Sequence, residues 1–381
     1  MLLLCHICMK KICLATLLLL WISASKAQQW LEWFGFRSLN DTVSTEKTGF
    51  ALIPLLYYTP DTRFAFGAAG VYYFSLKAKR PDQRDARLSY VQFLADYTQN
   101  NQLDIWGLWN IFTRNEDYLI KGELRYRNFP DRFYGIGNAT GRDQVEYYSY
   151  DLKSFKYLML KRLTKEMFLG FDFMISNEYN FRIKEGGILD LGNITGNRGG
   201  VTSGIGGVVT FDSRDNIVNP YSGHFFEIST YYFHPNIGSS FYFFNFNINY
   251  QTYWETKPKN ILAFQIVGRF NTNGVPMLDM ATAGGDEILR GYARNRFRDI
   301  NFAGTQLEYR FPLFWRLGLV GFAGVGDVFN STADLSIQRL KYSFGTGLRF
   351  AINPAERLNL RFDVGIGREG AQYYLMVTEA F

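Results

Sequence analysis

The chain has 381 residues, of which 18% are aromatic and only 10 are proline, and its mean hydropathy is -0.14. These values exclude a disordered chain and a bundle of membrane helices. Three of the 41 basic residues lie near the N-terminus, so the remainder almost balances the 35 acidic residues and nucleic-acid binding is not predicted. The 35 Phe and 25 Tyr are typical of strands whose outer surface faces lipid.

Residues 1–27 predict a secretory signal peptide. Lys10 and Lys11 form a basic region, residues 12–24 are apolar, and Ala27 ends a small-residue cleavage site. The apolar run is shorter than the roughly 20 residues of a membrane-spanning helix. We therefore expect cleavage after Ala27, which places the mature chain outside the cytoplasm.

Residues 28–47 read as a short periplasmic lead-in, and residues 48–381 read as successive strands and turns. Segment 118–127 shows the recurring pattern, with apolar side chains on one face and charged side chains such as Lys121 and Glu123 on the other. One face suits lipid and the other suits water. The predicted strands are 49–58, 63–76, 87–97, 102–112, 118–127, 145–160, 166–177, 201–212, 225–232, 241–254, 260–270, 301–311, 316–327, 341–351, 357–367 and 372–381.

Sixteen such strands, with short turns at one end and long loops at the other, predict an all-β fold. Main-chain groups in hydrocarbon all need partners, so membrane strands must close into a cylinder. We expect a 16-stranded antiparallel transmembrane β-barrel in the outer membrane of a Gram-negative bacterium, in contact with its lipid. In the last strand Tyr373, Leu375, Val377 and Phe381 share one face, and Phe381 is expected to end that strand.

Two motifs resemble those of the bacterial surface antigen superfamily, which includes the BamA and TamA barrels. A turn between the eighth and ninth strands is similar to the family pattern D-x-R-D-N-x-x-x-P-x-x-G, and a loop between the eleventh and twelfth strands is similar to its L-R-G-Y type motif. The turn motif comprises Asp212, Arg214, Asp215, Asn216, Pro220 and Gly223, and the loop motif comprises Leu289, Arg290, Gly291 and Tyr292. The resemblance covers roughly residues 48–381.

The resemblance implies that the long loop folds into the lumen and that Arg290 pairs with acids of the inner wall. Glu308 matches one family acid, whereas Gly324 stands where the family has the other. The candidate acids are therefore Glu308, Asp363 and Glu227. The alternative is an Arg290 that is simply solvated. Inward-facing glycines predict room for a loop, or else bends in the wall.

Enzyme chemistry finds little support in the sequence. All three cysteines lie in the leader, so no disulfide or thiolate metal site is expected in the mature chain. Its two histidines, His224 and His234, do not combine with a serine and an orienting group in any pattern that predicts a hydrolase. We expect no catalytic residue, no metal and no cofactor.

The resemblance also implies a function, the insertion or translocation of outer-membrane or surface proteins. In the family a weak seam between the first and last strands opens to pair with client strands; here segment 49–58 would face segment 372–381. The periplasmic POTRA domains usual in the family are not expected, so a periplasmic partner would have to deliver unfolded clients. The alternative is a passive barrel, either a small-solute channel or a structural surface protein. A plugged lumen favours the first function and an open lumen favours the second.

Overall fold

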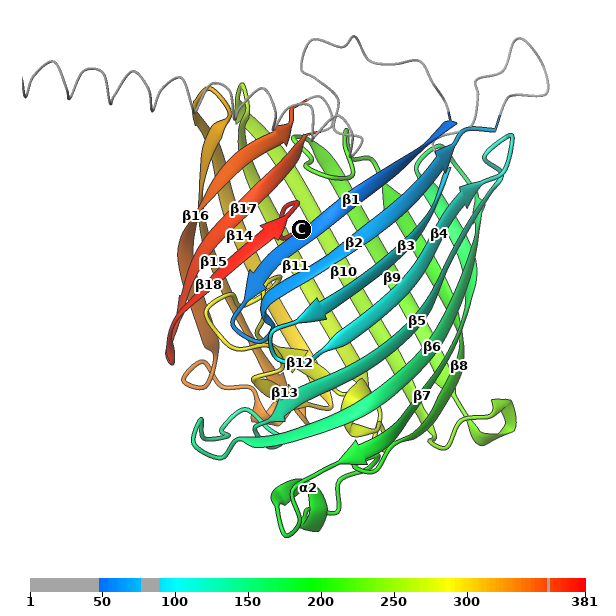
Figure 1. Cartoon of the computed structure of the whole chain (residues 1–381), viewed down its shortest axis with the longest axis vertical. Coiled ribbons are helices and arrows are strands. Elements are labelled where there is room, and N and C mark those ends of the chain that lie inside the picture. Colours follow the sequence, from blue (N-terminus) through cyan, green and yellow to red (C-terminus); the bar gives the residue numbers. More distant parts are fainter. Residues whose placement is uncertain (1–47, 77–88, 355–356) are drawn as a thin grey trace, which may run out of the picture.

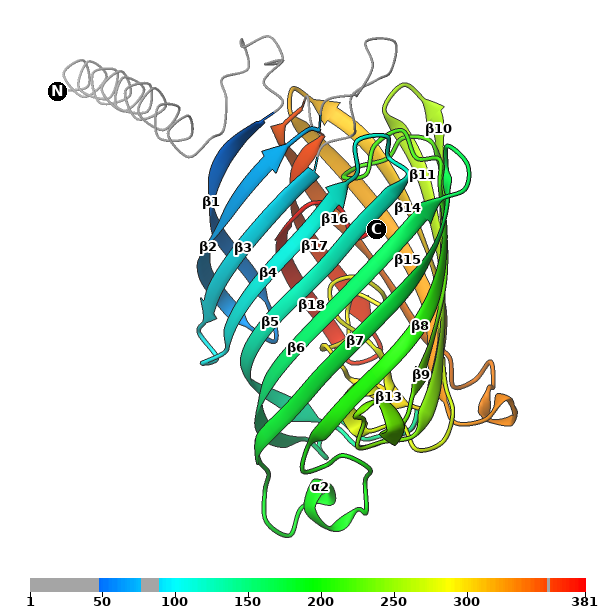
Figure 2. The same ribbon diagram turned by 90° about the vertical axis from the view of Figure 1, so that its right-hand side faces the viewer.

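The computed structural model describes residues 48–76, 89–354 and 357–381. In these residues sixteen strands form one closed antiparallel barrel, which confirms the predicted fold class (Figures 1 and 2). Each strand pairs with its neighbours in the sequence, except that β11 pairs with β14 and the first strand meets the last. No helix of the described residues is long and apolar enough to cross a membrane.

The barrel strands tilt steeply around the cylinder (Figure 2). Their bounds are β1 Thr48–Thr59, β2 Arg63–Phe74, β3 Ser89–Thr98, β4 Leu103–Phe112, β5 Tyr118–Phe133, β6 Glu146–Arg162, β7 Met167–Arg182, β8 Gly200–Asp212, β9 Gly223–Phe233, β10 Phe243–Lys257, β11 Asn260–Asn271, β14 Asn301–Phe314, β15 Leu317–Phe329, β16 Lys341–Asn353, β17 Leu358–Gly367 and β18 Gly370–Val377. We call the end at which β1 begins the periplasmic end, following the expected orientation, and the opposite end the outer end.

The number and order of the predicted strands agree with the barrel, but two strands reach at least five residues further outward than predicted. Strand β5 continues to Phe133 and β7 continues to Arg182, whereas β6 starts at Glu146, close to its predicted start. The antiparallel ladder between β5 and β6 satisfies main-chain groups up to the pair Phe133↔Glu146, so it persists beyond the membrane-crossing length. The predicted loop 178–200 also contains a short helix, α2 (Ile188–Leu191). The start of the predicted strand 87–97 lies outside the described residues.

The two faces of the wall differ as the alternation predicts. In β5, Leu124 is 60% exposed on the outer face, whereas Arg127, three residues later, is 8% exposed in the lumen. Outward apolar side chains recur around the cylinder, for example Phe66, Phe93 and Phe344. In a membrane these side chains face lipid, and the buried polar side chains line the interior.

The prediction that Phe381 ends the final strand is wrong. Strand β18 stops at Val377, and Thr378 has a positive φ of 75° that turns the chain away from the wall. The ring of Phe381 then lies 6.2 Å from that of Tyr253 in β10, inside the barrel. Tyr373 and Val377 remain exposed on the outer face, as predicted, with Leu375 half-buried beside them. Figure 1 shows β18 ending part-way along β1, and no other described strand continues the sheet on that side of β1.

Candidate functional site: the lumen loop and the seam

The connection between β11 and β14 lies inside the barrel (Figures 1 and 2). It contains a short 3-10 helix, η2 (Met277–Asp279), and a two-stranded sheet of β12 (Ala281–Ala283) and β13 (Phe297–Asp299). The loop is packed against the wall through a cluster of buried apolar residues, which comprises Val267, Ala281, Ala283, Ile288, Leu289, Tyr292, Phe297, Phe302 and Val328. The loop is therefore a folded part of the interior with its own apolar core.

Arg290 lies at the tip of this loop and is 1% exposed. Its guanidinium forms an ion pair with Glu308 of β14 and another with Asp363 of β17, in which Nη1 lies 2.6 Å from Oδ2. The ring of Phe322 in β15 lies against the guanidinium, with 3.6 Å between the guanidinium carbon and the ring centroid. The two carboxylates and the aromatic face together stabilise the Arg290 guanidinium, which is buried away from water.

Two of the three candidate acids therefore meet Arg290. Asp363 supplies the second carboxylate from β17, two strands away from the position on β15 where Gly324 stands. Glu227 lies elsewhere on the wall, in β9, where the main charges acting on it are those of Lys121 and Lys156. The solvated alternative for Arg290 is wrong, because both of its acid partners are fully buried.

The pair extends into a larger network across the lumen. Arg349 donates to Asp363 at 2.5 Å and to Glu379 at 2.6 Å, and Arg310 donates to Glu308 at 2.9 Å. The guanidinium groups of the network are those of Arg290, Arg310, Arg349 and Arg361, and the carboxylates are those of Asp286, Glu308, Asp363 and Glu379. The network contains equal numbers of positive and negative groups, and their mutual attraction offsets the free-energy cost of removing each group from water.

Glycines allow the loop to lie directly on the wall. A Cβ atom on Gly365 of β17 would lie 2.6 Å from both the main-chain carbon and the main-chain oxygen of Arg290. Gly291 has a positive φ of 116°, and a Cβ atom there would lie 2.6 Å from the nitrogen of Gly367. Gly324 differs, since its nearest contacts would be an ordinary 3.4 Å. Room for the loop thus explains Gly365 and Gly367 rather than every inward glycine.

Two tyrosines connect the motif to the last strands. Tyr374 of β18 accepts a hydrogen bond from the main-chain N–H of Gly291 (3.1 Å) and donates one to the oxygen of Tyr292 (3.2 Å). Tyr292 donates to the oxygen of Tyr342 in β16 (3.1 Å) and accepts from the N–H of Arg368 (3.1 Å). The motif therefore contacts every strand from β14 to β18.

The seam between β1 and β18 is the weakest join of the wall. Among the described residues these strands share one register pair, Tyr58↔Leu375. By contrast, β17 and β18 pair continuously from Leu360↔Val377 to Gly367↔Gly370. Most of the β1 edge therefore lacks a strand partner on its β18 side, and unpaired main-chain groups are costly in hydrocarbon.

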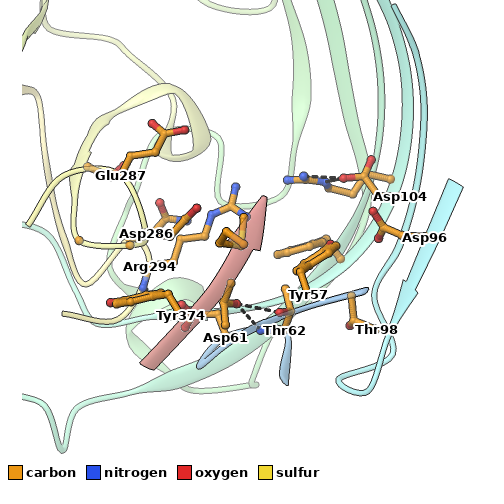
Figure 3. A pocket seen from close by; sticks show the side chains of 18 of the residues that line it. Tyr57, Asp61, Thr62, Asp96, Thr98, Asp104, Asp286, Glu287, Arg294 and Tyr374 are labelled. Carbon is orange, nitrogen blue, oxygen red and sulfur yellow. Dashed lines mark hydrogen bonds and ion pairs between the residues drawn. The ribbon is translucent and has the colours of Figure 1, made fainter. Parts of the chain in front are cut away.

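A cavity of about 510 Å³ lies directly behind the seam (Figure 3). Its lining includes Tyr57 of β1, Tyr374 of β18, and Asp286 and Arg294 of the loop. Across it, Asp104 accepts hydrogen bonds from the guanidinium groups of two wall arginines, Arg125 and Arg127. The loop occupies the interior on one side of this cavity, so the space at the seam is a chamber with a mixed polar and apolar lining beside the folded loop.

The predicted turn motif forms a salt-linked turn at the periplasmic end. Asp212 pairs with Arg214, while Asn216 Oδ1 accepts from the N–H groups of Val218 and Asn219. Gly223 has a positive φ of 104°, and a Cβ atom there would clash with the main-chain oxygen of Ser213; Pro220 is buried. In the described part of the chain no group of three or more His, Cys, Asp or Glu side chains is placed to hold a metal ion.

Asp215 ties this turn to another strand connection. Its carboxylate pairs with Arg357 at 2.6 Å and accepts main-chain hydrogen bonds from Tyr221 and Ser222. Partial burial raises the pKa of Asp215, but the hydrogen bonds from Arg357 and the main chain outweigh it, and the pKa is lowered overall. The motif residues therefore fix a turn rather than form a reaction centre.

Sequence reasoning missed the residues that join the loop to the seam strands. Tyr374 faces inward because it alternates with the outward Tyr373, but nothing in the alternation indicates that a loop main chain lies within its reach. Asp61 and Arg296 lie in a turn and a loop, where periodicity says nothing about partners. Only the tertiary arrangement identifies these three residues.

Comparisons with known proteins agree with this architecture. A family profile described as the Omp85 superfamily domain matches residues 40–373. The structure is similar to that of BamA from Haemophilus ducreyi lacking POTRA domains 1–3, with a TM-score of 0.60 and 13% identity over 93% of this chain and 78% of that one. It is also similar to CdiB from Acinetobacter baumannii, with a TM-score of 0.54 and 12% identity over 87% and 60% of the two chains.

CdiB from Escherichia coli has a TM-score of 0.56 and 9% identity, with coverage of 88% of this chain and 68% of that one. At these identities the likeness to solved structures concerns the fold. No curated protein sequence matches the chain.

Proposed function

The chain belongs to the Omp85 superfamily of outer-membrane barrels, and on that premise we propose that it assists the insertion or translocation of outer-membrane or surface proteins. The observation that carries the proposal is the seam, where β1 and β18 share one register pair among the described residues. A wall that is fully paired elsewhere and barely paired at one join has a defined place to open. Strand addition at that edge is the activity this arrangement supports best.

The exposed edge of β1 has the properties that a client strand needs. Its unpaired N–H and C=O groups can form a ladder with an extended segment, as in other cases of strand addition. Phe50, Leu52 and Leu56 are exposed on its outer face, so an added strand with outward apolar side chains would continue the lipid-facing surface. An incoming strand thereby gains main-chain partners before it has formed a barrel of its own.

Several features complete the proposal. Residues 1–27 act as a signal peptide that is removed after Ala27, and a periplasmic partner delivers unfolded clients to the barrel. The barrel works by pairing and release, without covalent chemistry, a cofactor or a metal. The alternative is a passive barrel, and the cavities beside the loop, of about 510 and 340 Å³, are the observation that favours a small-solute channel.

A reversible lock of the seam tests the proposal. Tyr58→Cys with Leu375→Cys joins the one register pair, and the chain has no cysteine beyond Cys13 that would interfere. The matched control, Val364→Cys with Tyr373→Cys, joins β17 to β18, which are already fully paired. The measurement is the protein composition of the outer membrane.

We expect the seam lock to deplete particular barrel or surface proteins, the control to deplete none, and a reductant to restore them. Deletion of the gene should deplete the same set. An unchanged composition after both locking and deletion would contradict the assembly function, and conductance through purified barrels would then test the channel.

A further inference from the structure

The lumen loop contacts both sides of the seam. Its motif bonds to β14–β18, and the residues that follow bond to the opposite side of the join. The main-chain N–H of Arg294 donates to Oδ2 of Asp61, in the turn after β1, at 2.9 Å. The amide of Asn295 donates to Oδ2 of Asp131 in β5 at 3.2 Å. The loop therefore crosses the seam from the inside (Figure 3).

Asp61 is a well-anchored partner for the loop. Its second carboxylate oxygen forms an ion pair with Arg132 of β5, and its main-chain oxygen accepts a hydrogen bond from Asn100 at 2.5 Å. The Asp61 side chain is only 11% exposed. The turn that binds Arg294 is therefore attached to the β3–β4 turn and to β5. A displacement of the loop would be transmitted to the N-terminal strands of the wall.

Arg296 makes a second crossing with a single side chain. Its Nε donates to Glu369, in the turn between β17 and β18, at 2.8 Å. Its Nη1 and Nη2 donate to the hydroxyl and main-chain oxygens of Thr140, in the connection between β5 and β6, at 2.9 and 2.8 Å. Arg296 is 2% exposed, so its guanidinium is shielded from water, whereas the Glu369 carboxylate is partly exposed. One guanidinium therefore holds together two connections on opposite sides of the seam.

We propose that residues 294–296 form an internal clasp that keeps the seam shut, and that its release is the step that admits a client strand. This inference rests on the proposed function. Among the described residues the wall contributes one register pair to the join, whereas the clasp contributes several hydrogen bonds, each of which involves a carboxylate or a guanidinium. Such bonds are stronger than neutral ones, so the clasp rather than the ladder determines when the seam opens.

The position of the clasp also sets the direction of opening. Asp61 follows the end of β1, and Glu369 lies in the outer turn before β18, so the clasp and the pair Tyr58↔Leu375 are both at the outer end. Towards the periplasmic end the edge of β1 continues, whereas the chain after Val377 turns into the lumen. In the described part of the chain the periplasmic end of the β1 edge has no strand partner on this side, so a client can make its first contact there and can pair along the rest of the edge only once the clasp is released.

Amide hydrogen exchange of the purified full-length protein in lipid nanodiscs tests the clasp. We expect Asp61→Ala and Arg296→Ala to accelerate exchange in segments 50–58 and 371–377, by roughly tenfold or more in the double variant, because each removes hydrogen bonds that involve a charge. The matched control is Arg127→Ala, which removes a buried guanidinium whose partner, Asp104, lies on the same side of the seam. It should leave the exchange of both segments unchanged.

Unchanged exchange in the double variant, or equal acceleration in the control, would overturn the clasp. If the alanine variants do not fold, Asp61→Asn and Arg296→Lys keep the size or charge of each side chain, and we expect the same acceleration to a smaller extent. Unchanged exchange in these folded variants would also overturn the clasp. The exchange experiment contains no client, so its outcome is independent of the assembly function, which the seam lock tests in cells.

Discussion

Gly365→Ala should detach the loop motif from the wall with the smallest possible change. The added Cβ would lie 2.6 Å from two main-chain atoms of Arg290 and 2.8 Å from the nitrogen of Gly291, against about 3.4 Å for an ordinary contact. Main-chain atoms cannot rotate away, so the motif must shift by several tenths of an ångström. The hydrogen bond from Arg290 to Asp363 (2.6 Å) and that from Gly291 to Tyr374 (3.1 Å) would both be strained.

The magnitude follows from two contributions. Overpacking of a close contact costs about 1–3 kcal/mol, and each weakened hydrogen bond costs about 0.5–1.5 kcal/mol. We expect a loss of about 2–4 kcal/mol in the free energy of unfolding, measured by urea titration of the barrel in detergent. Cleavage of the loop by added protease should accelerate in parallel, because the loop opens more often.

Gly324→Ala is the matched control. It adds the same methyl group to another inward glycine, but the nearest atoms would be at an ordinary 3.4 Å. We expect its unfolding midpoint and loop cleavage to stay close to those of the unmodified chain. If Gly365→Ala behaved like Gly324→Ala in both assays, the loop main chain would not lie against β17 as described.

Three further predictions concern charges and the end of the chain. Asp363→Ala should destabilise the barrel by about 3–5 kcal/mol in urea titration, because it leaves the buried Arg290 with one acid, and an effect below 1 kcal/mol would contradict a buried pair. Asp215 has a lowered pKa in the folded chain, so its stabilisation is present above its unfolded pKa and lost as pH falls through the folded value. Asp215→Asn should therefore lower the unfolding midpoint at pH 7 and have little effect near pH 3; a constant difference between these pH values would count against the ion pair. Phe381→Ala removes the ring packed beside Tyr253 and should lower the midpoint, whereas no change would show that the inward turn contributes nothing.

The sequence predicts the barrel well because strand alternation is a local property. Each membrane strand must show lipid one face and the lumen the other, so the pattern around Leu124 and Arg127 can be read without knowing any partner. The family motif likewise indicates which arginine enters the lumen. The sequence does not predict which residues become partners across the lumen. Asp363 reaches Arg290 only because the barrel curvature brings β17 opposite the loop tip.

The end of the chain shows the limit of the same reasoning. Residues 378–381 read Thr-Glu-Ala-Phe, and the prediction extends the strand to Phe381 because that residue shares the face of Tyr373, Leu375 and Val377, although the same alternation places Glu379 on the lipid face. The structure instead offers them ionic and aromatic partners inside, with Glu379 bound by Arg349 and Phe381 near Tyr253. A strand without a neighbour along this edge has little to keep it in the sheet, and that condition depends on tertiary structure.

The order of the strands has a consequence for how the cylinder forms. Every join except that between β11 and β14 and the seam links strands that follow one another directly, so hairpins can zip together with short loop closures. The seam joins the two ends of the barrel sequence, so its closure costs the most chain entropy, and among the described residues it gains a single ladder pair. Closure of the barrel between β1 and β18 is therefore expected to be the last and slowest event in folding. The hydrogen bonds between Tyr374 and the loop can form only after β18 has formed. We expect the folding intermediate that accumulates to be an unclosed sheet in which the lumen loop has not yet bound β18.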